Sequence, residues 1–271
     1  MSSNYRRLSQ SYASTRVSLR WLPEPPFENT ETLVLTVGEW YVDLRVDKGS
    51  GALDWAIAGE CTVKDVNPRR IVFTHTIDSH GNFNVSDPCP FIPLPNGYDL
   101  ETGAMPRPDL SGNPVTEYEE LWRYLSKDEI GMDAVESPTA WILESEDDCP
   151  SHHLQQGFKT FLARIEGRYL ALQQTRPRAT DQMSGSERKR KIVGGEVSAK
   201  SEEFVDGRWR AKYALGPNHS DLPSITCDFD ALDQHSWGFP EKKVNVRGCK
   251  YVVRAFEVSG KLFYPTQPAK V

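Results

Sequence analysis

The sequence predicts an all-β protein, built as two tandem antiparallel barrel-like halves with only minor helix. Three observations support this prediction. Apolar side chains alternate along short segments and change parity at glycine-containing corners. The same pattern recurs once, 128 residues further along, and 19 Gly and 19 Pro residues divide the chain into short segments. We expect a flexible segment over residues 1–14, a first half over 15–147 and a second half over 155–265.

The first hairpin is expected over residues 32–46. Its apolar side chains stand at odd positions up to Val37 and at even positions from Trp40 to Val46. A change of parity across Gly38-Glu39 is typical of a two-residue β-turn, because Gly supplies a positive φ at the first turn position. A helix would need apolar residues three and four positions apart, and this segment lacks that spacing.

The second hairpin repeats this pattern. Phe161, Ala163 and Ile165 stand at odd positions, Glu166-Gly167 forms the turn, and Leu170 begins the even positions. We interpret the pair as an ancient duplication; two unrelated hairpins in a β-rich chain are the alternative. A small-residue turn before an acid is expected after each hairpin, at Ala58-Gly59-Glu60 and Gly194-Gly195-Glu196.

The other segments are predicted mainly from composition. We expect a Pro- and Gly-rich excursion over residues 86–114, a short helix or an edge strand over 116–125, an acidic linker over 144–153, a polar connection over 174–191 and a closing hairpin over 243–257. Regular short strands separated by turn residues indicate a sandwich or a barrel.

Several motifs carry a resemblance. In chain order they are residues 53–59 (LDWAIAG), 101–103 (ETG), 120–123 (ELWR), 194–197 (GGEV), 207–209 (GRW) and 243–253 (KVNVRGCKYVV). From about residue 14 to residue 257, the chain resembles the fungal Hri-one protein family, the interactors of a yeast casein kinase I homologue. The resemblance implies two lipocalin-like (calycin-like) β-barrels, a location in cytoplasm and nucleus, and association with that kinase as the protein partner. It implies no established biochemical activity and carries over no catalytic or ligand residue.

Three functions follow as hypotheses. The first is a protein-interaction module, for which we expect no enzymatic activity. The second is a lipocalin-like carrier of a small apolar ligand, and the third is a decarboxylase or isomerase that uses a barrel cavity. The seven tryptophans either fill the barrels or line a cavity. If there is a ligand pocket, we expect Trp55, Trp40 and Trp209 to line it.

Other candidate sites are predicted to be structural. His75 and His80 flank Asp78, and we expect a hydrogen-bonded structural pair here rather than a general base. No cofactor is expected, because the sequence has neither a phosphate-loop motif nor a G-x-G-x-x-G motif. No metal is expected, because the histidines at 152 and 153 lack the four ligands that a closed zinc site requires. The five cysteines are expected to be reduced. The basic run at 187–191 is a solvated loop, an import signal or a contact for an anionic partner.

Charge and hydropathy restrict the partners. A net charge of −6 argues against nucleic acid, whose phosphates require a basic face. The sequence has no apolar run of membrane-spanning length and no apolar segment within its first 20 residues, so we expect neither a membrane partner nor a secretory signal. We also expect that open sheet edges, or the seam between the halves, can form a homodimer.

Overall fold

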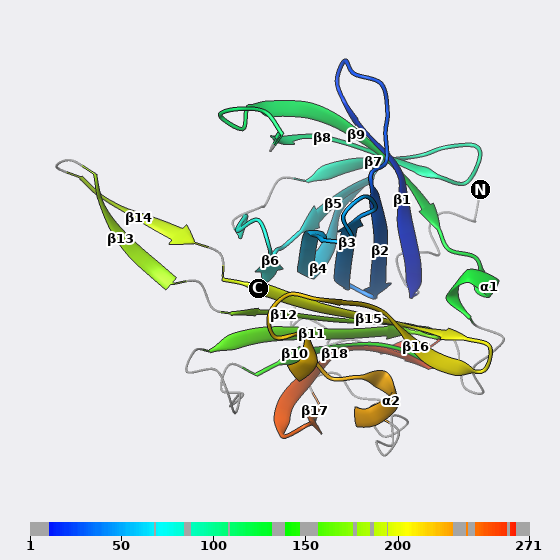
Figure 1. The fold of residues 1–271 in the computed structure, drawn as a ribbon. Coiled ribbons are helices and arrows are strands. Elements are labelled where there is room, and N and C mark those ends of the chain that lie inside the picture. Colours follow the sequence, from blue (N-terminus) through cyan, green and yellow to red (C-terminus); the bar gives the residue numbers. More distant parts are fainter. Residues whose placement is uncertain are drawn as a thin grey trace, which may run out of the picture.

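The computed structural model describes residues 11–67, 69–83, 88–107, 109–131, 139–146, 157–175, 178–184, 187–193, 195–229, 237, 242–258 and 261–263. Over these residues the fold is all-β, with two large antiparallel sheets and one separate two-stranded sheet (Figure 1). The first sheet contains β1 (Tyr12–Trp21), β2 (Thr30–Val37), β3 (Trp40–Asp47), β4 (Leu53–Val66), β5 (Arg69–Phe73), β6 (Ile77–Asp78), β7 (Cys89–Pro93), β8 (Asp99–Pro106) and β9 (Val115–Tyr124).

The second sheet contains β10 (Thr139–Ser145), β11 (Phe158–Ile165), β12 (Arg168–Thr175), β15 (Val197–Val205), β16 (Arg208–Leu215), β17 (Lys243–Val246), β18 (Cys249–Val258) and β19 (Lys261–Phe263). The two-stranded sheet is formed by β13 (Arg178–Ser184) and β14 (Glu187–Val193). Helix is minor, as predicted, with α1 (Lys127–Ile130), η3 (His219–Asp221) and α2 (Ile225–Asp228). None of the described helices is long and apolar enough to cross a membrane.

The first sheet closes into an eight-stranded barrel. Its strands follow the order β3-β2-β1-β9-β8-β7-β5-β4, and β4 pairs back onto β3. The short β6 pairs with β4 beside this ring. Because the ring is closed, the described strands of the first half leave no free barrel edge.

The second sheet has the same strand order as part of the barrel. Its order β16-β15-β12-β11-β10-β18-β17 matches β5-β4-β3-β2-β1-β9-β8. Moreover, β11 and β12 begin 128 residues after β2 and β3 (158 − 30 = 168 − 40 = 128), which agrees with the predicted duplication. Within the described residues β16 and β17 do not pair with each other, so two closed barrels remain a prediction.

The largest apolar core lies between the barrel and the second sheet, which Figure 1 shows stacked one above the other. Each half contributes its outer face, from β2 and β3 on one side and from β11 and β12 on the other. The alternating faces predicted from sequence therefore pack against each other across this seam. In the seam core lie Leu35, Val37, Val42, Leu44, Val46, Ala56, Ala58, Ile77, Ile142, Phe161, Ala163, Ile165, Leu170, Leu172 and Ala199.

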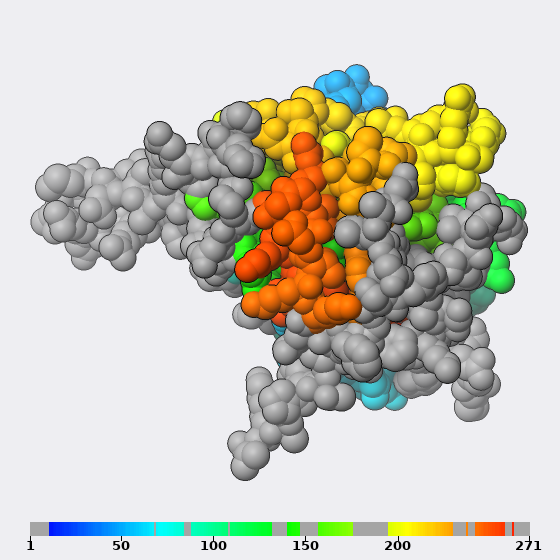
Figure 2. Space-filling view, turned by 90° about the horizontal axis from the view of Figure 1, so that it is seen from below, coloured from blue at the N-terminus to red at the C-terminus, as the bar shows by residue number. Residues whose placement is uncertain are grey.

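Each half also has an inner core of its own. Inside the barrel, Val34, Tyr41, Ile57, Ile71 and Phe91 pack together. The second sheet curves around an aromatic core that includes Trp141, Tyr169, Phe229, Trp237 and Phe256. Seen from below (Figure 2), the orange residues of α2, β17 and β18 cover part of this side of the molecule, beside the yellow residues of β15 and β16.

Several segments differ from their prediction. The expected excursion over 86–114 contains β7 and β8. The segment 116–125 lies almost entirely in β9, which is an inner strand between β1 and β8 rather than a helix or an edge. The expected polar connection over 174–191 contains the β13–β14 hairpin. Composition fails here because a strand with long-range partners tolerates Pro, Gly and charge that a local pattern assigns to loops.

The boundary between the two halves lies earlier in the chain than predicted. The strand β10 pairs with β11 and β18 in the second sheet, although it precedes the predicted boundary at residue 147. The acidic residues at its end misled the prediction, because Glu144 is buried and paired with Lys159 and Arg254. Gly59, predicted in a turn, lies within β4, where a Cβ atom would stand 2.1 Å from the Thr74 carbonyl oxygen.

Candidate functional site

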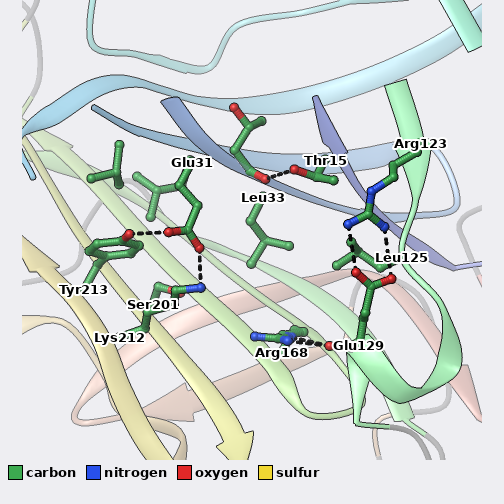
Figure 3. A pocket seen from close by; sticks show the side chains of 13 residues that line it. Thr15, Glu31, Leu33, Arg123, Leu125, Glu129, Arg168, Ser201, Lys212 and Tyr213 are labelled. Carbon is green, nitrogen blue, oxygen red and sulfur yellow. Dashed lines mark hydrogen bonds and ion pairs between the residues drawn. The ribbon is translucent and has the colours of Figure 1, made fainter. Parts of the chain in front are cut away.

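A cavity of about 280 Å³ lies at one end of the seam between the halves (Figure 3). Strands β1, β2, β3 and β9 with α1 contribute one wall, and β12, β15 and β16 contribute the other. Four of its lining residues are aliphatic and five are charged. The lining residues are Thr15, Glu31, Thr32, Leu33, Leu44, Val46, Arg123, Leu125, Glu129, Arg168, Ser201, Lys212 and Tyr213.

Glu129 links the two walls of this seam pocket. Ser126 and Glu129 form the capping box that begins α1, so the Glu129 side chain has a fixed position. The Arg123 guanidinium binds this carboxylate at 2.8 Å and, with the Ser126 backbone, lowers the pKa of Glu129 to about 2. From the other half, Arg168 donates to the Glu129 carbonyl oxygen at 2.8 Å.

Glu31 makes the second connection across the seam. It pairs with Lys212, and the Tyr213 hydroxyl donates to it at 2.6 Å, both from β16 (Figure 3). Burial raises the pKa of Glu31, but the hydrogen bonds from these two partners outweigh it and leave the pKa below its usual range. Arg168 pairs in turn with Glu203. Each charge in the pocket thus has an opposite partner, so the pocket is suited to holding the halves together rather than to attracting a net charge.

The interior of the barrel contains a second polar cluster. Arg45 on β3 pairs with Asp43 at 2.9 Å and with Glu120 on β9 at 3.1 Å. Glu120 also accepts a hydrogen bond from Arg16 on β1 at 2.6 Å. All four side chains are nearly inaccessible to solvent, so the pairs are compensated charges that fill the middle of the barrel.

Glu101 lies beside this cluster. Its carboxylate accepts hydrogen bonds from the Tyr118 hydroxyl and the Trp122 indole, each at 2.9 Å. Burial, with the nearby charge of Glu120, raises the pKa of Glu101 to about 7. Such a group could exchange a proton at neutral pH. Glu101 does not line the seam pocket, so it lacks the access to a substrate that a general acid or base requires there.

The three tryptophans predicted to line one pocket lie in three different places. Trp55 is inside the barrel, where the Arg45 guanidinium lies 4.9 Å from its ring centroid. Trp40 stacks on Phe161 at the seam, with ring centroids 6.1 Å apart. Trp209 packs at the edge of the aromatic core of the second sheet. None of the three lines the seam pocket.

The hydrogen-bonded pair predicted at Asp78 is confirmed for His75. His75 Nδ1 lies 2.6 Å from one Asp78 oxygen, and the Trp55 indole donates to the other at 2.9 Å. The His80 ring stacks on Trp55. The Gln174 side chain from β12 bonds both the N–H and the C=O of Asp78, at 2.9 and 2.8 Å, and so joins the two halves as a further strand pair would.

Two predictions concern cysteines and metals. Cys249 is disulfide-bonded, so the expectation of five reduced cysteines is wrong. Sequence spacing does not show which Cβ atoms come within bridging distance. In the part of the chain that the structure describes, no three His, Cys, Asp or Glu side chains gather as metal ligands. The histidines predicted as a weak metal patch, at 152 and 153, lie outside the described residues.

The basic run at 187–191 falls on a strand. It belongs to β14, which pairs with β13 along its whole length, from Arg178↔Val193 to Ser184↔Glu187. Among the described strands this hairpin pairs only with itself, and it extends away from the body of the molecule (Figure 1). Sequence reasoning missed the hairpin because its strands are mostly polar.

Comparison with known proteins identifies the family. The sequence model of the family described as Protein HRI1 matches residues 12–237. The chain belongs to the HRI1 family. The resemblance noted in its sequence motifs is thereby confirmed. None of the curated protein sequences matches the chain.

A solved structure supports the fold of this HRI1 family member. The chain is similar to the crystal structure of the uncharacterized protein YLR301w from Saccharomyces cerevisiae, with a TM-score of 0.64. The similarity covers 92% of this chain and 99% of the yeast chain, at 15% sequence identity. At this level of identity the comparison supports the fold alone.

Proposed function

We propose that the chain is a protein-interaction module without enzymatic activity, and that the β13–β14 hairpin is its contact element. The observation that carries this proposal is the hairpin itself. It pairs with no other described strand and projects from the body (Figure 1). A segment that pairs with neither large sheet of its own chain is well suited to meet another protein.

The charge of the hairpin supports an acidic partner. Residues 188–191 are four consecutive basic residues in a chain of net charge −6, so the remaining residues sum to −10. Basic charge concentrated on a projecting element of an acidic protein guides association with an acidic surface and disfavours association through the body.

The family resemblance supplies the first partner to test. It implies a casein kinase I homologue, and a location in cytoplasm and nucleus, which we include in the proposal. We also propose that the second sheet forms a second closed, lipocalin-like barrel. The strand order that it shares with the first barrel supports this.

The test is isothermal titration of the purified chain against the purified kinase. One variant reverses the hairpin charges with Arg188→Glu, Lys189→Glu, Arg190→Glu and Lys191→Glu. The control reverses four exposed basic residues of the two large sheets, Lys64, Arg208, Arg210 and Lys250, and changes the net charge by the same amount.

We expect the hairpin variant to lose binding and the control to retain it. The affinity of the unmodified chain is also expected to fall with added salt, because exposed charges are screened. Absence of binding by the unmodified chain would contradict the proposal. Equal loss in both variants would also contradict it, because net charge alone would then explain the effect.

A further inference from the structure

A second cavity, of about 280 Å³, opens at one end of the barrel. The β2–β3 turn, the start of β1, the end of β4 and the second half of β5 surround it. Its lining residues are Tyr12, Gly38, Glu39, Cys61, Val63, Val66, Ile71 and Phe73. This barrel-mouth pocket is distinct from the seam pocket, with which it shares no lining residue. Its volume is near the lower limit for small-molecule sites, about 300 Å³.

The walls of the barrel-mouth pocket are apolar and continuous with the barrel core. Cys61 and Ile71 are buried members of that core, and Val63 and Phe73 pack against it. Val66, at the rim, is 59% exposed. An exposed apolar rim that leads to an apolar interior allows a ligand to bury surface on both.

The polar groups within the pocket are neutral. Burial raises the pKa of the Cys61 thiol to about 12, and the carboxylates of Glu39 and Glu60 add to this effect. Burial likewise raises the pKa of the Tyr12 hydroxyl above its usual range. A thiol and a phenol that keep their protons at neutral pH provide hydrogen bonds but no charge.

The charge at the opening disfavours anions. Glu39 is exposed on the β2–β3 turn and is the one charged residue among the eight that line the pocket. Arg69, whose charge acts on the Tyr12 hydroxyl, is paired with Asp99 at 2.6 Å. An anionic ligand would therefore meet a carboxylate and find no cation in the lining.

We propose that the barrel-mouth pocket binds a small, neutral, apolar molecule. The apolar walls provide the affinity, and the carboxylate at the rim selects against anionic amphiphiles such as fatty acids. This inference does not depend on the hairpin proposed as the protein contact. The hairpin charge-reversal variant is expected to bind the ligand of the barrel-mouth pocket with unchanged affinity.

A matched pair of fluorescent probes tests the inference. N-phenyl-1-naphthylamine is neutral, and 1-anilinonaphthalene-8-sulfonate has the same rings with an added sulfonate. In titrations of the full chain, we expect saturable binding of the neutral probe with a stoichiometry of one. We expect the sulfonate to bind at least about tenfold more weakly.

Three variants locate the site. Val66→Asp at the rim is expected to weaken binding of the neutral probe about tenfold. Val115→Asp, the control, changes a valine that is 71% exposed and does not line the pocket, and is expected to have no effect. Glu39→Lys is expected to strengthen binding of the sulfonate probe and to leave binding of the neutral probe unchanged. Because all three positions are exposed, the variants are expected to fold.

Three results would overturn the inference. One is equal affinity of the unmodified chain for both probes. Another is an equal loss of affinity for the neutral probe in Val66→Asp and Val115→Asp. The third is binding of the neutral probe only by a chain that lacks residues 1–10, because the chain's own segment would then be the occupant of the pocket.

Discussion

Replacement of Phe161 by alanine tests whether the two halves form one folding unit. Phe161 is fully buried in the seam core, and its ring stacks on Trp40 of the other half. Truncation of a buried phenylalanine costs about 3–5 kcal/mol, which includes the cavity left behind. The lost aromatic pair accounts for about 1 kcal/mol of this. Because the contact lies between the halves, its loss destabilises both.

Urea denaturation measures this effect. With an m value of about 3 kcal/mol/M, a loss of 3–5 kcal/mol lowers the midpoint by about 1–1.7 M. Far-UV circular dichroism and tryptophan fluorescence are expected to report one transition, with both halves unfolding together. Val115→Ala is the control, because that side chain is 71% exposed and its loss is expected to change stability by less than about 0.5 kcal/mol.

Two results would refute this reasoning. A midpoint lowered by less than about 0.3 M would show that the surroundings of Phe161 collapse or that the seam is not a packed core. Two separate transitions in the unmodified chain, with only the second-sheet transition moved by Phe161→Ala, would show that the halves fold independently despite the shared core.

Three further predictions concern other contacts. The pKa of Glu101 is raised in the folded state, so Glu101 stabilises the fold below its unfolded pKa and loses this contribution as the pH rises through about 7. Glu101→Gln is therefore expected to flatten the fall in unfolding free energy between pH 5 and pH 8. Gly59→Ala is expected to lower the melting temperature because of the clash with Thr74, whereas Gly49→Ala, whose Cβ has room, is tolerated. Gln174→Ala is expected to cost about 1–3 kcal/mol in urea denaturation, because the backbone of Asp78 loses its partners.

The sequence predicts the hairpins well because their signal is local. Alternation and the parity change at Gly38 locate β2 and β3, and the repeat at Glu166 locates β11 and β12. Both Gly38 and Glu166 have a positive φ, 60° and 51°. A period of two defines two faces of a strand but not what each face meets. The apolar faces were therefore predicted, but not their packing between the halves.

The polar interior of the barrel could not be predicted, although a signal was present. On the face opposite Val42 and Leu44, β3 carries Asp43 and Arg45, which are unusual in a barrel interior. The Arg45 partner Glu120 lies 75 residues further along the chain, and no local pattern connects two positions so far apart. Trp40 was expected to line a ligand pocket because alternation alone does not show which face of a strand points into the barrel.

Each half presents its counterpart strands to the other at the seam, with β2 against β11 and β3 against β12. A surface that meets its own equivalent is self-complementary, which is the contact expected of a two-fold symmetric dimer. The seam within this single chain thus has the contact pattern of a two-fold symmetric homodimer interface. Either half expressed alone would expose this surface and is expected to pair with a second copy of itself.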